Sequence, residues 1–397
     1  MAKVRVTRSV EVPDRLRVSR YHKIPELGPR LLFFSGGTAL NGLCQTLKNY
    51  THNSTHLVTP FDSGGSSAEL RQAFDMPAIG DLRSRLVALA DDTVLGHPEV
   101  YRLFTYRFGR RTSNKALRER LDAMVAARDK LVADINNPMR RLICNQLGYF
   151  RDAMPAEFDL RGASIGNLIL AGGYLNNHAE LDSIIFLFSK LVNAQGTVRA
   201  VVDDDLHLGA DLKDGTQVIG QHRLTGKEVE PLTSPIRRVF LSRERDRAVE
   251  VRPQLGKKNR KLIEAADLIC YPPGSFYSSV LVNLLPAGVG RAIASNDCPK
   301  VYVPNLGDDP EQVGMSVGKM LDALLRPLQC DAGNNIPADA LLNFVLVDTR
   351  NGVYPSRLPK KKLQSLGIQL IDTRLVSEHS TLYYDNELLV SALLSLV

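Results

Sequence analysis

Short apolar runs alternate with amphipathic stretches along most of this chain. The apolar runs predict strands at residues 30–34, 55–61, 197–202, 268–271, 300–303, 344–347 and 368–371. The first two runs each lead through a glycine-rich turn into a helical pattern, at 40–50 and around 68–74. Strands that alternate with helices are typical of an α/β protein, in which helices flank a mostly parallel sheet. We therefore predict this fold class.

Two segments interrupt the alternation. Residues 115–135 carry an apolar stripe at helical spacing and predict one helix within a helical insertion at about 112–160. This insertion either caps the main domain, forms an oligomer contact or packs peripherally on the body. Residues 197–250 have polar β-like stretches with turn signals at Asp214-Gly215 and Thr225-Gly226, which predict a small strand-rich excursion. Both segments are expected to be embedded in an α/β domain spanning 31–397.

Charge separates residues 1–30 from the rest of the chain. The formal net charge is +7, and the first 30 residues alone hold eight basic and three acidic side chains. The remainder is close to balance and lacks the dense basic stripe of a duplex-binding protein. We expect the basic N-terminal arm to be a solvated tail and nucleic acid not to be a partner, with a polyanion contact through the arm as the alternative.

Other sequence features bear on location and metal content. The chain has neither an apolar run of the roughly 18–20 residues that cross a membrane nor an apolar stretch behind the N-terminal charges, so we expect a cytoplasmic protein. The five cysteines are odd in number and contain no CxxC pair, which argues against a zinc ribbon or a disulfide framework.

The first candidate for ligand chemistry is the segment LLFFSGGTALNGL at 31–43. A buried strand runs into Gly36, Gly37 and Thr38 and then into a helix. Adjacent glycines allow the backbone to approach a phosphate and direct its N–H groups toward it. The loop has neither the lysine of a Walker A motif nor the G-x-G-x-x-G spacing. A phosphate site and a tight strand–helix turn both fit this pattern.

The second candidate is THLVTPFDSGGSSAELR at 55–71. Asp62 ends the strand and is followed by Gly64, Gly65 and Ser66 before the next helix. Asp62 has three alternative roles: a ligand of a divalent metal, a partner for a ribose hydroxyl, or the cap of a turn. Ser66 has two: a contact to phosphate or a helix N-cap.

Three further helix starts carry similar residues. In 266–285, Gly274 and Ser275 are expected to present backbone N–H groups, and Tyr277 fits either stacking on a base or packing. Residues 161–173 place Ser164, Gly166 and Asn167 at a helix start. Residues 79–91 open a helix with Gly80-Asp81, where Asp81 is a candidate functional acid or a plain N-cap.

These loops are expected to act together. Ligands of open α/β sheets bind at the carboxyl ends of the strands, so several strand–glycine–helix turns can converge on one anionic ligand. The eight histidines form no metal-binding cluster, and we expect His178, His207 and His222 at the surface or in helices. No nucleophile arrangement is present, which disfavours a hydrolase. A nucleotide diphosphate is the ligand that the pattern favours.

The motifs together resemble a known family. They are SGGTALNGLCQTLK (35–48), FDSGGSSAELR (61–71), GDLRSRLVALAD (80–91), LFTYRFG (103–109), GASIGNLIL (162–170), PPGSFYSSVLVNLL (272–285) and VYVPNL (301–306). Their order and spacing are similar to the CofD/YvcK-like family, which contains the 2-phospho-L-lactate transferase and the bacterial gluconeogenesis factor that binds nucleotide sugars. The chain looks closer to the YvcK-like branch.

The resemblance implies a Rossmann-like fold with a nucleotide-diphosphate ligand across the loops, and a dimer is a reasonable expectation for such folds. The residues it implies for ligand binding are Gly36, Gly37, Thr38, Gly64, Gly65, Ser66, Ser164, Gly166, Asn167, Gly274, Ser275, Tyr277 and Asn305. Asp62 is the candidate ligand for Mg²⁺, and Asp62 and Asp81 are the candidate catalytic residues.

The chain also departs from the family pattern. Ala39 replaces a glycine, Ser63 replaces the second acid of a pair, and Ala163 replaces a histidine. Loss of a carboxylate weakens a two-acid metal site, and loss of the imidazole removes a general acid or base. We therefore expect a binding protein for a UDP-sugar type of ligand, with a regulatory or metabolic role. The alternative is a transferase that moves a phospho-acyl group from a guanine-type nucleotide diphosphate to an alcohol.

Overall fold

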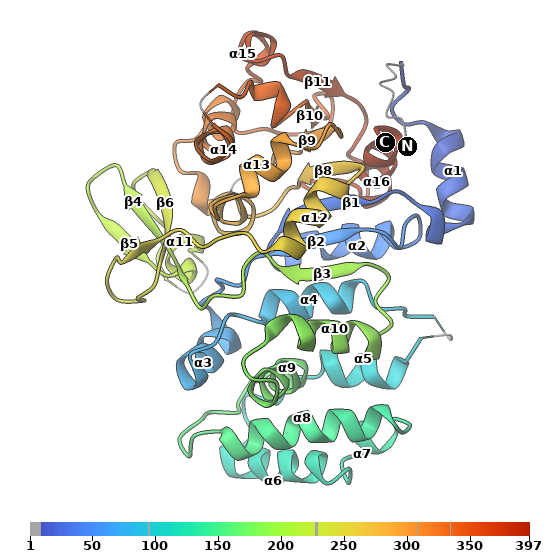
Figure 1. Cartoon of the computed structure of the whole chain (residues 1–397), viewed down its shortest axis with the longest axis vertical. Coiled ribbons are helices and arrows are strands. Elements are labelled where there is room, and N and C mark those ends of the chain that lie inside the picture. The colour runs from blue at the N-terminus through green and yellow to red at the C-terminus, as the bar shows by residue number, and fades with distance from the viewer. Residues whose placement is uncertain (1–8, 94–95, 227–228, 308, 334) are drawn as a thin grey trace.

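Seven parallel strands form the central sheet of the protein, in the order β11-β10-β9-β8-β1-β2-β3 (Figure 1). The computed structural model describes residues 9–93, 96–226, 229–307, 309–333 and 335–397. The strands are β1 (Leu31–Ser35), β2 (Thr55–Val58), β3 (Thr197–Ala200), β8 (Leu268–Tyr271), β9 (Lys300–Tyr302), β10 (Phe344–Val347) and β11 (Gln369–Asp372). Each of the seven predicted strands is present, and the α/β fold class is confirmed.

Strand β1 lies at the centre of this sheet and is buried along its whole length. Leu31 and Phe33 pack into one core with α2 (Asn41–Leu47), α4 (Gly80–Ala88) and α16 (Asn386–Ser395). Leu32 and Phe34 pack into a second core with α12 (Lys257–Ala265), α13 (Val289–Ala294) and α14 (Val317–Ala332). A strand covered on both faces must be apolar at successive positions, which explains the LLFF run.

The strand order reverses at β1. The chain proceeds from β1 to β2 and β3 on one side, and β8 to β11 extend the sheet from the other side of β1. The helix after β1 lies on one face of the sheet, whereas the helical turns after β8 lie on the opposite face. The carboxyl ends of β1 and β8 therefore bound a topological switch point, where open α/β sheets bind their ligands.

A block of helices extends away from β3 (Figure 1). It contains α3 (Gly65–Phe74), α5 (Pro98–Thr105), α6 (Asn114–Val125), α7 (Lys130–Ala133), α8 (Met139–Ala153), α9 (Ile165–Asn176) and α10 (Leu181–Leu191). Helix α8 runs so close to α9 that a Cβ at Gly172 would lie 1.9 Å from the carbonyl oxygen of Gln146. Helix α8 of the predicted insertion therefore packs on α9, and α6 packs in turn on α8.

The single helix predicted at 115–135 is wrong, because the stretch forms α6 and α7 with a break between them. Ala127 adopts a left-handed backbone with φ of 55°. The side chain of Asp129 then accepts a hydrogen bond from the amide of Leu131 at 2.9 Å and starts α7. The apolar stripe continues across this break, which is why periodicity alone predicted one helix.

The strand-rich excursion is a four-stranded antiparallel sheet in the order β5-β4-β6-β7. Its strands are β4 (His207–Leu212), β5 (Gln217–Ile219), β6 (Ile236–Ser242) and β7 (Glu250–Val251). The excursion begins later than predicted, because β3 belongs to the central sheet. Asp214-Gly215 forms the expected turn between β4 and β5, whereas Thr225-Gly226 ends the short helix α11 (Gln221–Thr225).

The N-terminal segment is folded against the C-terminus from residue 9 onward. Helix α1 (Arg15–Lys23) lies beside α16 (Figure 1). The guanidinium of Arg17 donates to the carbonyl oxygen of Ser395 at 3.0 Å, and the amide of Asp14 donates to its hydroxyl at 2.7 Å. Residues 9–30 are therefore folded and not a free tail, although α1 contains no buried residue. Residues 1–8 lie outside the described residues.

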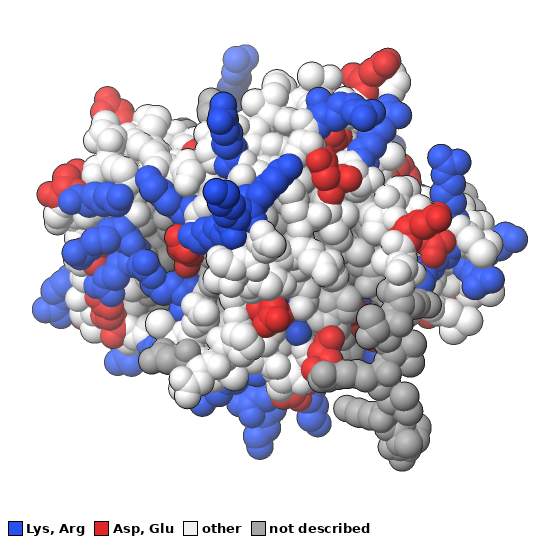
Figure 2. All heavy atoms as spheres, turned by 90° about the horizontal axis from the view of Figure 1, so that it is seen from above, with Lys and Arg blue, Asp and Glu red and all other residues white. Residues whose placement is uncertain are grey.

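The outer surface is mixed in charge on the face seen from above. Lysine and arginine side chains form several separate groups there, with aspartate and glutamate side chains between them (Figure 2). Among the described residues, no helix is long and apolar enough to cross a membrane.

Candidate functional site

A cavity of about 580 Å³ opens beyond the carboxyl ends of β1, β2 and β8. Many of the residues singled out from the sequence line it, namely Gly36, Gly37, Thr38, Asp62, Gly64, Gly65, Ser66, Asp81, Asn167, Gly274 and Ser275. Segments far apart in the chain thus meet at the switch point of the sheet. Ser164, Gly166, Tyr277 and Asn305 do not line the cavity.

A buried arginine holds the first glycine loop from behind. Arg85 on α4 has no solvent exposure, and its Nη2 donates to the carbonyl oxygens of Gly36 and Gly37, each at 3.0 Å. A peptide unit is planar and trans, so its N–H points opposite to its C=O. The N–H groups of Gly37 and Thr38 therefore point away from Arg85, and neither donates to another described residue.

Side chains approach the glycines of this loop closely from two sides. A Cβ at Gly36 would lie 2.3 Å from the hydroxyl oxygen of Ser279, and one at Gly37 would lie 2.4 Å from Oδ1 of Asp81. The carboxylate of Asp81 therefore lies against the first loop. Asp81 is not the N-cap of α4, since that position belongs to Ile79. The sequence allowed Asp81 to be either a functional acid or a plain N-cap. The structure places its carboxylate at the first loop and not at the N-cap position.

The second loop is closed by its own aspartate. Oδ1 of Asp62 accepts a hydrogen bond from the amide of Gly64 at 3.1 Å, and α3 follows directly. Ser66 does not cap this helix, because its hydroxyl accepts from the side-chain amide of Asn167 at 3.0 Å. The oxygen of the Asn167 amide is buried and has no partner among the described residues. Ser66 and Asn167 therefore join the starts of α3 and α9.

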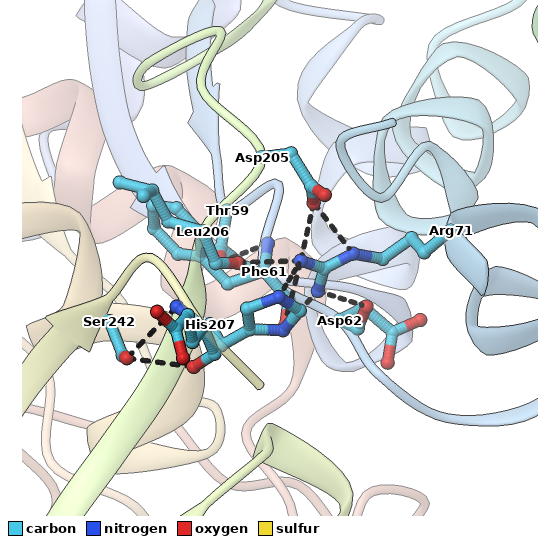
Figure 3. Close-up of polar contacts among 9 residues, drawn as sticks. Thr59, Phe61, Asp62, Arg71, Asp205, Leu206, His207 and Ser242 are labelled. Atoms are coloured by element: carbon cyan, nitrogen blue, oxygen red, sulfur yellow. Dashed lines mark hydrogen bonds and ion pairs between the residues drawn. The ribbon is translucent and has the colours of Figure 1, made fainter. Parts of the chain in front are cut away.

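Arg71 fixes the main chain of the second loop (Figure 3). Its guanidinium donates to the carbonyl oxygens of Asp62 at 3.2 Å and Leu206 at 2.8 Å, and it pairs with Asp205. The carboxylate of Asp62 points away from this guanidinium (Figure 3). Burial and the charge of Arg71 lower the pKa of His207 to about 4, so the ring is neutral. Arg71 thus couples the loop that carries Asp62 to the segment entering β4.

The third loop differs from the prediction in how its amides are used. The amide of Gly274 donates to Oδ1 of Asn305 at 2.7 Å, and the side-chain amide of Asn305 donates back to the carbonyl of Gly274 at 2.6 Å. The amide of Phe276 donates to Asp309 at 3.0 Å. The expectation that Gly274 presents its N–H to a ligand is therefore wrong, and Asn305 shapes the loop from behind.

A buried glutamate accepts hydrogen bonds from two amides that follow in the chain. The amides of Tyr277 and Ser278 donate to Oε2 of Glu311 at 2.8 and 2.9 Å. These residues form a π-helical turn, η3 (Phe276–Val280), followed by the 3-10 helix η4 (Leu281–Leu284), and not the regular helix that was predicted. Tyr277 is buried, and its hydroxyl contacts the sulfur of Met315 at 3.7 Å, so its position is that of a packing residue.

The start of α9 lies behind the cavity wall. Ser164 is fully buried, and its hydroxyl has no partner among the described residues. Gly166 lies against α5, where a Cβ would be 2.6 Å from the carbonyl oxygen of Phe104. Both residues therefore serve the close packing behind the cavity wall.

Four arginines in the cavity wall were not selected from the sequence: Arg83, Arg107, Arg110 and Arg161. Arg83 is the deepest, and its Nε is buried without a partner among the described residues. Burial, together with the charge of Arg107, lowers the pKa of Arg83 to about 10. Arg161 is paired with Asp159. Arg83 and Arg107 lie in the motifs GDLRSRLVALAD and LFTYRFG, so the sequence could have indicated these two arginines as site residues.

His222 lies in helix α11, one of the two positions expected for it, and it also lines the cavity. Its Nδ1 lies 2.8 Å from the hydroxyl oxygen of Ser63 in the second loop. This contact joins residues 159 positions apart in the chain. Nothing in the local sequence pattern around His222 could indicate it.

The donor set fits Mg²⁺ only in combination with a ligand. Within the described ranges, no group of three or more His, Cys, Asp and Glu side chains is gathered for a metal. Asp62 and Asp81, which follow β2 and open α4, are two of the carboxylates in the cavity wall, beside Glu69 and Asp159. Mg²⁺ commonly binds one or two carboxylates together with phosphate oxygens and water, which this pair fits.

Known proteins share this chain's sequence and fold. Residues 31–378 match the family described as 2-phospho-L-lactate transferase CofD. A gluconeogenesis factor of Bacillus subtilis (strain 168) is 26% identical over 93% of this chain and 98% of its own length. A putative gluconeogenesis factor of Thermoanaerobacterium thermosulfurigenes is 30% identical over 75% of this chain and 74% of its own.

A solved structure resembles the whole architecture. A UPF0052 family member from Bacillus halodurans superposes with a TM-score of 0.65 at 25% identity, over 92% of this chain and 99% of that chain. The likeness therefore includes both the central sheet and most of the surrounding elements.

Proposed function

The chain belongs to the 2-phospho-L-lactate transferase CofD family, and from this we propose that it binds a nucleotide diphosphate of the UDP-sugar type across the loops that follow β1 and β2. One observation carries the proposal. Two amides of the first loop, at Gly37 and Thr38, are held facing away from a buried guanidinium and lie in the wall of a cavity at the switch point. Such amides recognise phosphate oxygens.

The charge around the cavity supports a polyanionic ligand. Arg83, Arg107 and Arg110 line the wall, and none of them forms an ion pair with a carboxylate in the part of the chain that the structure describes. Arg83 is partly buried, where charges interact more strongly than in water, so it attracts an anion. Arg107 and Arg110 are exposed and add positive charge to the wall. The volume of about 580 Å³ lies within the range of small-molecule sites.

Two carboxylates of the wall would hold Mg²⁺ together with the ligand. Asp62 and Asp81 would provide its protein oxygens, and the diphosphate would provide others. When bound, the ion neutralises charge on the diphosphate. Arg71 keeps the backbone of Asp62 in place for this contact.

The alternative function, a transferase, depends on the same carboxylates. Asp62 and Asp81 would then be catalytic residues in the transfer of a phospho-acyl group from a guanine-type nucleotide diphosphate to an alcohol. The position of Asp81 against Gly37 favours it, because a carboxylate beside the first loop needs a cation once a diphosphate is bound. The expected cytoplasmic location and dimer stay predictions for either reading.

Thermal-shift and calorimetric titrations separate the two readings. The full chain is titrated with UDP-N-acetylglucosamine, UDP, GDP and GTP, each with and without Mg²⁺. A ligand at one hundred times its dissociation constant stabilises by about 2.7 kcal/mol. Stabilisation by the UDP-sugar that is independent of Mg²⁺ supports the binding protein. Mg²⁺-dependent stabilisation by guanine nucleotides favours the transferase, and loss of turnover in Asp62→Asn would then support the role of Asp62.

A matched pair of variants tests the site itself. Arg83→Gln removes a cation from the cavity wall, whereas Arg102→Gln changes an exposed arginine of α5 that does not line it. We expect weaker nucleotide binding only in the first variant. Equal affinities in both variants, or no binding of any nucleotide to the unaltered chain, would reject the proposal.

A further inference from the structure

His222 reaches the cavity from the antiparallel sheet. It lies at the start of α11, directly after β5, where Gly220 turns the chain with φ of 107°. The main-chain amide of His222 donates to the hydroxyl oxygen of Ser63 at 3.2 Å, and its Nδ1 lies 2.8 Å from the same oxygen. Ser63 stands between Asp62 and Gly64, so the ring lies beside the second glycine loop.

These two contacts favour one placement of the ring proton. The Ser63 oxygen already accepts the main-chain N–H, and its single hydroxyl proton has Nδ1 as its acceptor among the described residues. When the hydroxyl donates to Nδ1, that ring nitrogen carries no proton, and the neutral imidazole bears its proton on Nε2. Nε2 makes no hydrogen bond to any described residue, and the ring lines the cavity. In this tautomer the ring offers an N–H donor to the cavity.

We propose that His222 is a ligand-contacting residue whose Nε2–H donates to a phosphate oxygen of the bound nucleotide diphosphate, and that Ser63 is the positioning residue that orients the ring. The inference rests on the proposed function and names a contact within it. The second loop beside the ring is one of the two loops assigned to the phosphates. A donor next to such a loop meets anionic oxygens, whose hydrogen bonds are roughly twice as strong as neutral ones.

The pairing of Ser63 with His222 also relates two departures from the family pattern. The resemblance noted above implies an acid at position 63 and a histidine at position 163, and this chain has Ser63 and Ala163 instead. His222 places an imidazole in the same cavity from a different element. A serine at position 63 accepts the main-chain amide and still donates to the ring, which a carboxylate cannot do when ionised.

The contact is tested by calorimetry on the full chain with UDP and UDP-N-acetylglucosamine. In His222→Gln the side-chain amide nitrogen stands near the position of Nε2, whereas in His222→Asn it stands near that of Nδ1 and does not reach as far. We expect His222→Asn to lose about tenfold or more in affinity for UDP, the range for one hydrogen bond to a charged group. His222→Gln should lose clearly less, and Arg102→Gln should lose nothing.

Ser63→Ala tests the positioning role by a signal that folding alone does not move. Nitrogen-15 NMR of the imidazole should show the proton on Nε2 in the unaltered chain and a mixture of tautomers in Ser63→Ala, with unchanged thermal midpoints. The Nδ1–H tautomer in the unaltered chain would overturn the assignment.

The outcomes separate this inference from the proposed function. Nucleotide binding with equal affinities for His222→Asn and the unaltered chain overturns the inference alone. A loss confined to the UDP-sugar and absent for UDP moves the contact to the sugar and also overturns the phosphate assignment. Absence of any nucleotide binding to the unaltered chain rejects both.

Discussion

The guanidinium of Arg85 donates to the carbonyl oxygen of Gly37 at 3.0 Å from a position with no solvent exposure. The same nitrogen, Nη2, also donates to the carbonyl oxygen of Gly36, and Nη1 donates to the sulfur of Cys44 at 2.8 Å. No carboxylate among the described residues is paired with it. A buried cation without a counter-ion is costly, so an anion bound on the far side of the loop would offset part of that cost.

Replacement of Arg85 should therefore affect both stability and binding. Arg85→Gln leaves buried carbonyl oxygens without donors and should lower the free energy of unfolding by about 2–4 kcal/mol. It should also weaken diphosphate binding, because the cation behind the loop is lost. Arg85→Lys keeps the charge and should retain more affinity than Arg85→Gln. Urea denaturation and calorimetry measure the two effects, and a folded Arg85→Gln variant with full affinity would contradict the role given to Arg85.

Gly36 and Ser279 form a tightly matched pair. A Cβ at Gly36 would lie 2.3 Å from the hydroxyl oxygen and 2.7 Å from the Cβ of Ser279. We expect Gly36→Ala to cost about 1–3 kcal/mol in the free energy of unfolding, as overpacking does. Ser279→Gly in the same chain should restore most of that loss, because the remaining contact, to the Cα, is at 3.2 Å. Ser279→Gly alone is the control, and no recovery in the double variant would mean that Gly36 is needed for another reason.

Replacement of Arg71 should destabilise the second loop and the antiparallel sheet locally. Arg71→Gln removes the ion pair with Asp205 and the donors to Asp62 and Leu206. Breaking a largely buried pair from one side is strongly destabilising, and we expect a loss of about 2 kcal/mol or more. Hydrogen exchange should accelerate in β4 and in the loop after β2. Arg237→Gln, which removes a more exposed pair with Asp211, should leave both segments protected.

The strands were the most predictable part of the fold. Leu268–Tyr271 and Phe344–Val347 have the predicted bounds, because a strand buried on both faces is a continuous apolar run and has clear ends. The predicted helix at 115–135 failed because Ala127 adopts a left-handed backbone, for which alanine gives no signal. Local pattern therefore identified the elements better than the breaks between them.

The site was predictable where it depends on local loops and not where it depends on distant partners. The turns after β1 and β2 could be recognised from glycines next to buried strands. The third loop was recognised in the same way, and Gly274 and Ser275 line the cavity. The use of its amides could not be predicted, because their acceptors, Asn305, Asp309 and Glu311, come from the next strand end and the turn beyond it. His222 arrives from another sheet, so only the folded chain brings it to Ser63.

Glu311 gives the protein a pH-dependent stability with a defined sign. Its side chain is 1% exposed and accepts hydrogen bonds from the amides of Tyr277 and Ser278 and from the Ser278 hydroxyl. Burial, followed by the charge of Asp309, raises the pKa of Glu311 to about 7. A glutamate in an unfolded chain has a pKa of about 4.3. Between these values the folded state binds the proton more tightly than the unfolded state does.

Stability should therefore fall as the pH rises from about 4.3 to about 7, and the contribution of this carboxyl is fully present only below that window. Glu311→Gln keeps a neutral side chain of the same shape at every pH, so the difference in unfolding free energy between it and the unaltered chain should change across the window and level off above it. Asp203, whose pKa burial raises to about 6, titrates in the same direction in both proteins and cancels in that difference. Urea denaturation at pH 5, 6, 7 and 8 measures it. Parallel profiles for the two proteins would mean that the carboxyl of Glu311 is ionised throughout, held by the three donors of the η3 turn.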